Sequence, residues 1–514
     1  MHTTPNFSRK ENSLLFYALI LLIILNIVNR IIVLDKFAFV YSDADQVMMW
    51  IGSYDFYKLE FYEPAYYGQN YNTMLEALLA APFFRFASPA YILPIVTSTL
   101  ALFPYFILAI VCYRKQLKVQ SLFIMAIPLL LPPEYDFITS MPRGFVTGIF
   151  FAVLASIYVY YQDKKWSFFL FAFFSVLGFA LNPNGILYTL PCGLFLLYQN
   201  YKKKSFYIQS ALGGALAAIY PLYISYFYQK YPNYLVHELW TLRFSFESLK
   251  MGLTNLSNHF GSIAPIYWYH STMVILIFTA IPVIFLIQKK YSWTIISVIT
   301  ILLTLLTFGV NKIYDGDGSV FLPVSRMYLA IPFMIVLWVS FMEIKKWKIP
   351  VALLLVITCC SFMQRTIIID DVVDTATIPP KNSLLTAYKM EPLEADCDRI
   401  YELVRRFDVN RIIVAHHWAD KYLSYACPSC NTDIPLTLTP SNDRRTWRLL
   451  QEKDLVYKTI LFIDETQQIK EEALVPGKKP IELIALGNNT FLLQNNSLTI
   501  LELIKRLNIE LRSF

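Results

Sequence analysis

Charged side chains are scarce in this sequence of 514 residues. Asp, Glu, Lys and Arg make up 16% of it and hydrophobic residues 56%, with a mean hydropathy of +0.46. A soluble domain has a charged fraction near about a quarter. The hydrophobic residues form recurring stretches of roughly 15–24 residues, most of them long enough to cross a hydrocarbon layer of about 30 Å. The composition therefore excludes an ordinary soluble protein and predicts an α-helical polytopic membrane protein.

Several other features are missing as well. The sequence has no notable internal repeats and no low-complexity stretches. No small-residue cleavage site precedes Asp35, so the first hydrophobic stretch is expected to be a retained span and not a signal peptide. Seven cysteines are scattered along the chain, and only Cys427-Pro-Ser-Cys430 forms a close pair.

The hydrophobic stretches predict about eleven transmembrane helices. Apolar runs locate such helices but do not mark the residues at which they begin and end. The expected spans lie near 13–33, 89–112, 119–133, 144–161, 166–181, 185–200, 206–228, 271–288, 292–310, 326–342 and 349–364.

The loops between these spans alternate in charge. One set contains fifteen basic residues against three acidic ones, Glu11, Asp163 and Glu343. The basic residues are Arg9, Lys10, Arg114, Lys115, Lys118, Lys164, Lys165, Lys202, Lys203, Lys204, Lys289, Lys290, Lys345, Lys346 and Lys348. Basic loops stay in the cytoplasm, so this set is expected to be cytoplasmic and the other extracytoplasmic. The net charge of +7 then reflects topology and does not predict a nucleic-acid partner.

Hydrophobicity falls and charge rises in the C-terminal part. We therefore expect a transmembrane domain over 1–368 and a small soluble α/β domain over 369–514 on the extracytoplasmic side. Short buried strands are predicted at Arg411–Ala415 and Thr459–Ile463, with amphipathic helices at Leu393–Phe407 and Leu498–Leu507. Two stretches of the first outer loop, Val47–Tyr57 and Thr73–Phe86, are too short or too charged to span and are expected along the membrane interface.

The close cysteine pair has two interpretations. In an oxidising compartment Cys427 and Cys430 can form a disulfide. A zinc site would need two further ligands, which only His416 and His417 offer, and we consider it the less favoured reading.

The first outer loop, 34–88, carries the main candidates for chemistry. Asp43 and Asp45 follow the first span and are separated by one residue. Such carboxylates can share a divalent cation, or one can act as a general base. The alternative is an acidic loop exposed to solvent. Their position at a membrane exit favours a catalytic role.

A second candidate group follows in the same loop. The segment from Glu63 to Tyr71 combines acidic, amide and aromatic side chains, which carbohydrate recognition needs. An interfacial aromatic belt is the alternative reading. The expected substrate-binding residues here are Glu63, Tyr67, Gln69, Tyr71 and Glu76.

Three charged residues mark the second outer loop. Glu134 and Asp136 are tentative metal ligands, and Arg143 is expected to bind a phosphate. Helix-flanking anchors are an equally good reading of this group.

Later loops supply three weaker binding candidates. Lys312 and Arg326 lie in the fifth outer loop, where a half-buried cation needs an anionic partner such as a loop aspartate or a phosphate. His237 lies in the fourth outer loop, and a lone histidine of this kind is more often structural or solvated.

Together these features resemble the GT-C superfamily of membrane glycosyltransferases, most of all glycosyltransferase family 39 and the aminoarabinose-transferase-like members of bacteria. Five segments of the membrane part carry the resemblance, and their order along the chain is similar. They are Ser42-Asp-Ala-Asp-Gln46, Tyr66-Tyr-Gly-Gln-Asn-Tyr71 with Leu75-Glu76, Pro142-Arg-Gly-Phe145, Asn182-Pro-Asn-Gly-Ile-Leu-Tyr188 and Ser325-Arg-Met-Tyr-Leu-Ala-Ile-Pro332. Asp45 is followed by Gln46, where the family pattern has an Asp-Glu pair, so either Asp43 or Asp45 can be the base.

The resemblance implies a polyprenyl-phosphate-linked sugar donor and an inverting transfer to a glycan, lipid or protein acceptor. The transfer would take place at the outer face of a bacterial inner membrane, optionally with a divalent cation such as Mg or Mn. A transporter or flippase of lipid-linked glycans is the main alternative. It is less favoured because the spans contain few charges, whereas transporters often carry charges near the midplane. A glycan polymerase or ligase is a third reading.

Overall fold

A computed structural model describes residues 7–70, 72–232, 234, 243–267, 270–310, 329–344, 346–377, 387–415, 424–440, 446–464, 481–507 and 509. The chain divides into two compact units that interleave along the sequence. The first unit contains residues 1–38, 94–221 and 240–386, and the second contains 39–93, 222–239 and 387–514. The second unit therefore joins the first outer loop to the C-terminal tail, whereas the sequence predicted a linear division at 368.

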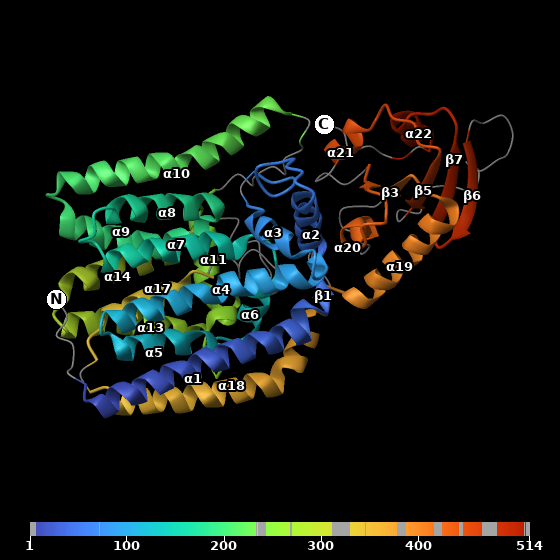
Figure 1. Cartoon of the computed structure of the whole chain (residues 1–514). Coiled ribbons are helices and arrows are strands. Elements are labelled where there is room, and N and C mark those ends of the chain that lie inside the picture. Colours follow the sequence, from blue (N-terminus) through green and yellow to red (C-terminus); the bar gives the residue numbers. More distant parts are fainter. Residues whose placement is uncertain are drawn as a thin grey trace. The chain divides into compact units, whose positions relative to one another are not determined.

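The first unit is helical (Figure 1). Its helices, including two that continue into the second unit, are α1 (Arg9–Val33), α4 (Pro89–Arg114), α5 (Lys118–Leu130), α6 (Pro133–Ser140), α7 (Phe145–Tyr160), α8 (Ser167–Leu181), α9 (Ile186–Asn200), α10 (Lys204–Lys230), α11 (Phe246–Thr254), α12 (Leu256–Phe260), α13 (Ser271–Ile287), α14 (Tyr291–Leu306), α17 (Ile331–Phe341) and α18 (Lys348–Thr377). α4 and α10 cross between the units at Pro94 and Pro221, two residues that cannot donate a backbone hydrogen bond.

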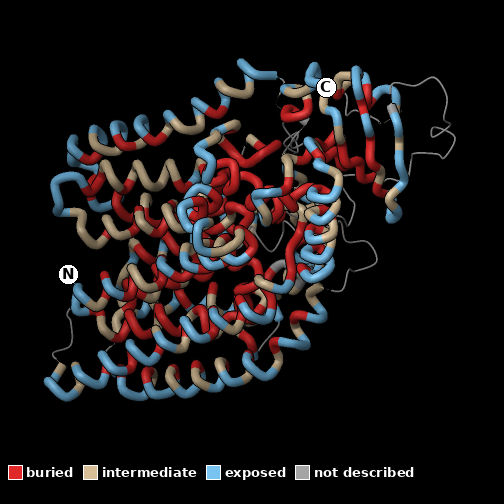
Figure 2. Tube along the Cα trace, turned by 45° about the vertical axis from the view of Figure 1, so that its right-hand side comes forward, coloured by how far each residue is buried: buried red, intermediate tan, exposed pale blue. Residues whose placement is uncertain are grey.

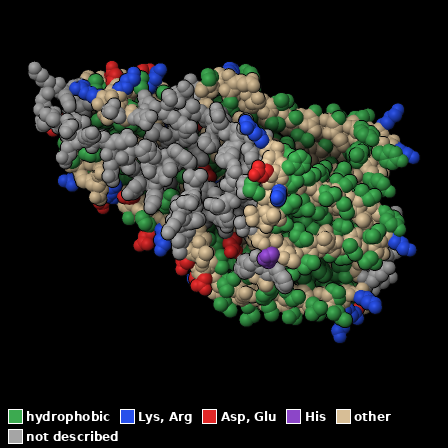
Figure 3. Space-filling model, turned by 180° about the vertical axis from the view of Figure 1, so that it is seen from behind, with side chains coloured by type: hydrophobic (Ala, Val, Ile, Leu, Met, Phe, Trp, Pro, Cys, Tyr) green, Lys and Arg blue, Asp and Glu red, His purple; other side chains and the backbone are tan. Residues whose placement is uncertain are grey.

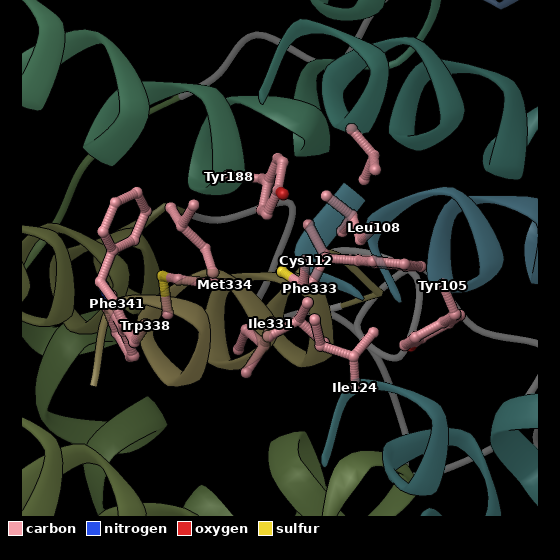
Figure 4. Packing of buried hydrophobic residues seen from close by; sticks show 14 of the residues in the cluster. Tyr105, Leu108, Cys112, Ile124, Tyr188, Ile331, Phe333, Met334, Trp338 and Phe341 are labelled. Atoms are coloured by element: carbon pink, nitrogen blue, oxygen red, sulfur yellow. The ribbon is translucent and has the colours of Figure 1, made fainter. Parts of the chain in front are cut away.

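The core of this unit surrounds α17, which packs against α5 and α9. Figure 4 shows Phe333, Met334 and Trp338 of α17 among side chains of α4, α5 and α9. Buried residues follow the inward sides of the helices, and exposed residues follow the outward sides (Figure 2). Figure 3 shows a broad hydrophobic surface on the helical part, with Lys and Arg side chains gathered at its edge. This distribution fits a helical membrane protein.

The expected count of eleven spans is wrong. Each expected stretch contains a helix, but in the described part of the chain only five helices are long and apolar enough to cross a membrane. They are α1 with its continuation to Ala38, α4, α10, α14 with its continuation to Gly309, and α18. α5 and α6 make a sixth if they count as one span, although they meet at an angle of 89°. Helices such as α7, with 16 residues, fall short of the roughly 20 residues that a crossing needs.

The second unit contains a five-stranded sheet with the order β4-β3-β5-β7-β6. β3 is parallel to both neighbours, and β7 is antiparallel to both of its neighbours. The strands are β3 (Arg411–Ala415), β4 (Thr437–Leu438), β5 (Thr459–Asp464), β6 (Ile481–Gly487) and β7 (Thr490–Asn495). The tail helices are α19 (Met390–Phe407), α20 (Cys427–Cys430), α21 (Thr446–Gln451) and α22 (Ile500–Arg506). The two predicted strands and two predicted helices of the tail are thus confirmed.

The first outer loop contributes α2 (Ala44–Tyr57) and α3 (Leu75–Ala80) to the same unit. Its short strand β1 (Tyr41–Ser42) pairs antiparallel with β2 (Tyr388–Lys389) of the tail. Residues 46–56 of α2 are all buried within the protein. The prediction that this stretch lies along the membrane interface is therefore not met, because protein atoms cover every side of the helix.

The disulfide between Cys427 and Cys430, one of the two interpretations of this pair, is not formed. Cys427 is bonded to Cys397 of α19, which ties α19 to α20. Cys430 is a free thiol. The zinc alternative loses Cys427 as a ligand for the same reason, and His416 and His417 lie outside the described residues.

Candidate functional site

Asp43 forms the N-cap of α2. It follows β1 directly, its side chain is 2% exposed, and its Oδ1 atom accepts a hydrogen bond of 2.9 Å from the backbone N–H of Gln46. A carboxylate in this position satisfies a helix N–H that has no partner within the helix, and contributes about 0.5–2 kcal/mol. Asp43 therefore has a structural role in starting the helix.

Asp45 lies in the first turn of the same helix and is half-buried. Its backbone carbonyl accepts a hydrogen bond from the Tyr66 hydroxyl. A negative charge in the first turn is also favourable, because the helix dipole is positive there. The Asp43 side chain thus caps the helix. The Asp45 side chain lies in the first turn and does not serve as the cap.

The segment after Glu63 folds back as a tight turn. The N–H of Gln69 donates to the Tyr66 carbonyl at 2.8 Å, and Gly68 has a φ of +73°, which glycine adopts without strain. The Glu63 carboxylate accepts from the Tyr228 hydroxyl at 2.7 Å. This turn brings Glu63 and Gln69, both buried, to the end of α10.

Two tyrosines fix this turn on α2. The Tyr66 hydroxyl reaches the start of α2 at Asp45, and the Tyr67 hydroxyl donates to Asp55 Oδ2 at 2.8 Å. Glu76 is buried in the first turn of α3, which packs against α2. The acidic motif and the aromatic-amide segment, separated in the sequence, are therefore in contact in the structure.

A second polar cluster lies in the helical unit, around Asp136. Its Oδ1 atom accepts from Arg30 Nη2 at 2.9 Å, and its Oδ2 atom accepts from Asn29 Nδ2 at 2.8 Å and from Arg365. Arg365 also donates to Asn29 Oδ1 and to the carbonyls of Pro128 and Leu131. These buried groups join α1, α6 and α18, so Asp136 has the geometry of a structural ion pair.

This cluster was missed by the sequence analysis, which ended the last span at 364. α18 continues to Thr377, and Arg365 is a fully buried side chain within it. The available signal was an ionisable residue between two apolar runs, since Thr366 is followed by three isoleucines. The sequence analysis expected few charged residues in the spans, and their number is indeed small. It did not predict that Arg30 and Arg365 are buried.

The other predicted residues of this unit lie near the same helices. Glu134 is half-buried at the start of α6. Arg143 is buried just before α7, beside Gly144, whose φ of +79° is left-handed. Among the described residues, no group of three or more His, Cys, Asp or Glu side chains is placed to hold a metal ion. The tentative metal role of Glu134 and Asp136 remains a prediction.

Four predicted binding residues lie outside the described residues. They are Tyr71, His237, Lys312 and Arg326. Their roles remain predictions from the sequence.

Comparisons with known proteins give no further assignment. No protein family, no curated protein and no solved structure matches this chain. The resemblance to membrane glycosyltransferases therefore rests on the sequence segments that carry it.

Proposed function

We propose that this protein is an integral-membrane glycosyltransferase that moves a sugar from a polyprenyl-phosphate-linked donor to an acceptor. The observation that carries the proposal is the hydrogen bond from Tyr66 to the Asp45 carbonyl. It joins the acidic motif to a segment with the carboxylate, amide and aromatic groups that bind sugars. Glu63, Tyr67 and Gln69 of that segment are all buried beside these motifs.

In this proposal Asp45 is the general base. Its carboxylate removes the proton from an acceptor hydroxyl, and the oxygen attacks the anomeric carbon as the bond to the donor phosphate breaks. The phosphate leaves with the bonding electron pair, and the configuration at the anomeric carbon inverts. Asp43 positions the start of the helix, because its own carboxylate caps α2. Arg143, Lys312 and Arg326 are the candidates for stabilising the phosphate.

We further propose that the second unit lies outside the cytoplasm. The Cys397–Cys427 disulfide supports this, because disulfides persist in oxidising compartments. The exposed lysines at 164, 165 and 202–204 support a cytoplasmic position for the short basic loops. A bacterial inner membrane is the proposed location.

One observation favours a transporter of lipid-linked glycans as the second candidate. Arg30, Asp136 and Arg365 are ionisable groups buried among helices, and intramembrane charges often mark transport pathways. The closed pairing of Asp136 with both arginines favours a structural role for the cluster and leaves the enzyme as the first candidate.

Purified protein in proteoliposomes distinguishes the two candidates. A panel of polyprenyl-phosphate monosaccharides is added to the outer leaflet, together with a membrane-lipid extract as acceptor. The enzyme proposal expects release of polyprenyl phosphate and a new glycosylated product. Movement of intact donor to the inner leaflet, with no cleavage, would contradict it and support the transporter.

A further inference from the structure

Helix α21 of the tail contacts the first outer loop within the second unit. The Trp447 ring lies 4.6 Å from the Tyr62 ring and 6.0 Å from the Tyr67 ring, measured between centroids. The Arg448 guanidinium lies 4.8 Å from the Tyr62 ring centroid, and its Nη1 atom is 3.8 Å from the Glu60 carboxylate. Trp447 and Arg448, two consecutive residues of the tail, thus contact Tyr62 and also a residue before it, Glu60, and one after it, Tyr67.

Trp447 also reaches the segment that follows α10. Its ring lies 5.3 Å from that of Tyr234, and Tyr228, near the end of α10, donates to Glu63. Burial, and next the charge of Glu63, raise the pKa of Tyr234. Trp447, which is 2% exposed, therefore lies among rings from both segments that surround Glu63.

Two buried polar atoms, one on Trp447 and one in the turn that contains Tyr67, point to a ligand. The indole N–H of Trp447 and the side-chain carbonyl of Gln69 are buried and make no hydrogen bond to any described residue. A buried polar group without a partner destabilises the fold, so each one needs an explanation, and a bound ligand supplies one. One is a donor and the other an acceptor, which is the combination that sugar hydroxyls satisfy.

The tail holds the acidic motif as well. β2 pairs with β1 immediately before Asp43, and the N–H of Met390 donates to the Val40 carbonyl at 2.8 Å. α20 packs against α2, and the disulfide joins α20 to α19. The tail therefore contacts both parts of the candidate site.

We propose that the C-terminal domain completes the sugar-binding site: the indole N–H of Trp447 contacts the sugar, and Trp447 and Arg448 together set the conformation of the 60–70 segment and so the choice of sugar. This inference rests on the proposed function for its ligand class. Whether Trp447 and Arg448 set the conformation of the 60–70 segment can be tested without measuring turnover.

Hydrogen exchange of the full-length protein in detergent tests the positioning. The Gln69 amide, bonded to the Tyr66 carbonyl, reports on the turn, and the amides of β5 and β7 report on the sheet. Trp447→Ala should raise exchange at the turn about tenfold or more by favouring local opening, with the sheet unchanged. Arg448→Lys, which keeps the charge but loses the planar stacking on Tyr62, should have a smaller effect in the same direction.

Arg405→Ala is the matched control, because Arg405 is exposed on α19 and stacks only on Tyr401 of its own helix among the described contacts. It should leave exchange of the turn unchanged. Unchanged protection of the turn in both Trp447→Ala and Arg448→Lys would overturn the inference. If Trp447→Ala does not fold, Arg448→Lys alone decides between the two outcomes.

Donor kinetics test the ligand class separately. Trp447→Phe keeps a ring but removes the indole N–H, so it should raise KM for the preferred polyprenyl-phosphate sugar about tenfold with kcat nearly unchanged. An unchanged KM would remove Trp447 from the sugar site. The wild-type protein could turn over no donor while Trp447→Ala still raises hydrogen exchange at the turn. The proposed function would then be contradicted, and the role of Trp447 in positioning the turn would be supported.

Discussion

At the scale of single residues, the two aspartates of one short motif have different tasks. The Asp43 side chain accepts a backbone hydrogen bond at the start of α2, whereas Asp45 lies in the first turn of the helix. The sequence predicted that this pair matters but left open which is the base. The choice depends on where α2 begins, and two acids separated by one residue do not reveal that.

The capping role predicts the effect of changing Asp43. Asp43→Ala should destabilise the protein by about 1 kcal/mol, whereas Asp43→Asn should have little effect because asparagine caps helices equally well. Thermal unfolding of both variants in detergent checks this difference. Equal stability of the Ala and Asn variants would show that the cap is unimportant.

The buried cluster around Asp136 gives a second prediction at this scale. Asp136→Asn leaves Arg30 and Arg365 without their carboxylate, and should destabilise the protein by about 3–5 kcal/mol. Combining it with Arg365→Met should restore part of the loss, since one uncompensated charge is removed. Thermal-shift measurements on the single and double variants test this coupling.

Lys36→Ala is the control for that experiment. It breaks the pair of Lys36 with Asp370, whose side chains are 44% and 68% exposed, and exposed pairs contribute only about 0–1 kcal/mol. A loss for Asp136→Asn no larger than for Lys36→Ala would contradict a structural role for the buried cluster.

At the scale of elements, the sequence predicted the existence of helices better than their lengths. Apolar runs mark a helix wherever a face is buried, so a helix occurs in each expected stretch. They do not mark bends: α5 and α6 meet at an angle of 89°, where Pro132 precedes the first residue of α6, Pro133. Apolar runs also do not show that α18 continues past Arg365, because the carboxylate that pairs with Arg365, on Asp136, is distant in sequence.

The disulfide between Cys397 of α19 and Cys427 of α20 can be checked chemically. Cys397 and Cys427 are separated by 30 residues, so closing this loop should stabilise the tail by about 3–4 kcal/mol. Peptide mapping by mass spectrometry should find this pair, and Cys397→Ser should lower thermal stability while Cys430→Ser should not. A Cys427–Cys430 peptide as the main species would contradict the connection.

The basic loops predict the direction of insertion. Single cysteines at the exposed positions Lys203 and Asp454, in a protein with serine at 359, 360 and 430, can be labelled by a membrane-impermeant maleimide. Asp454→Cys should react in intact cells, and Lys203→Cys should react only after permeabilisation. The reverse pattern would invert the topology.

At the scale of the whole molecule, the two compact units do not follow the linear division at residue 368 that the sequence predicted. The first outer loop and the tail form one compact unit, joined by the β1–β2 pair and by Trp447. The sequence predicted the sheet and helices of the tail, because their patterns are local. It could not predict the pairing of Ser42 with Tyr388, because short strands far apart in sequence carry no mutual signal.

Turnover of a polyprenyl-phosphate-linked sugar by the purified protein is the most direct measurement of the proposed chemistry. Asp45→Asn should lower the rate of polyprenyl-phosphate release by about 10²–10⁴-fold, the usual contribution of a general base, with only a small loss of thermal stability from the helix dipole. Asp163→Asn, which neutralises an exposed acid in a basic loop, should keep the wild-type rate. A folded Asp45→Asn variant that transfers sugar at the wild-type rate would contradict the assignment of Asp45 as the base.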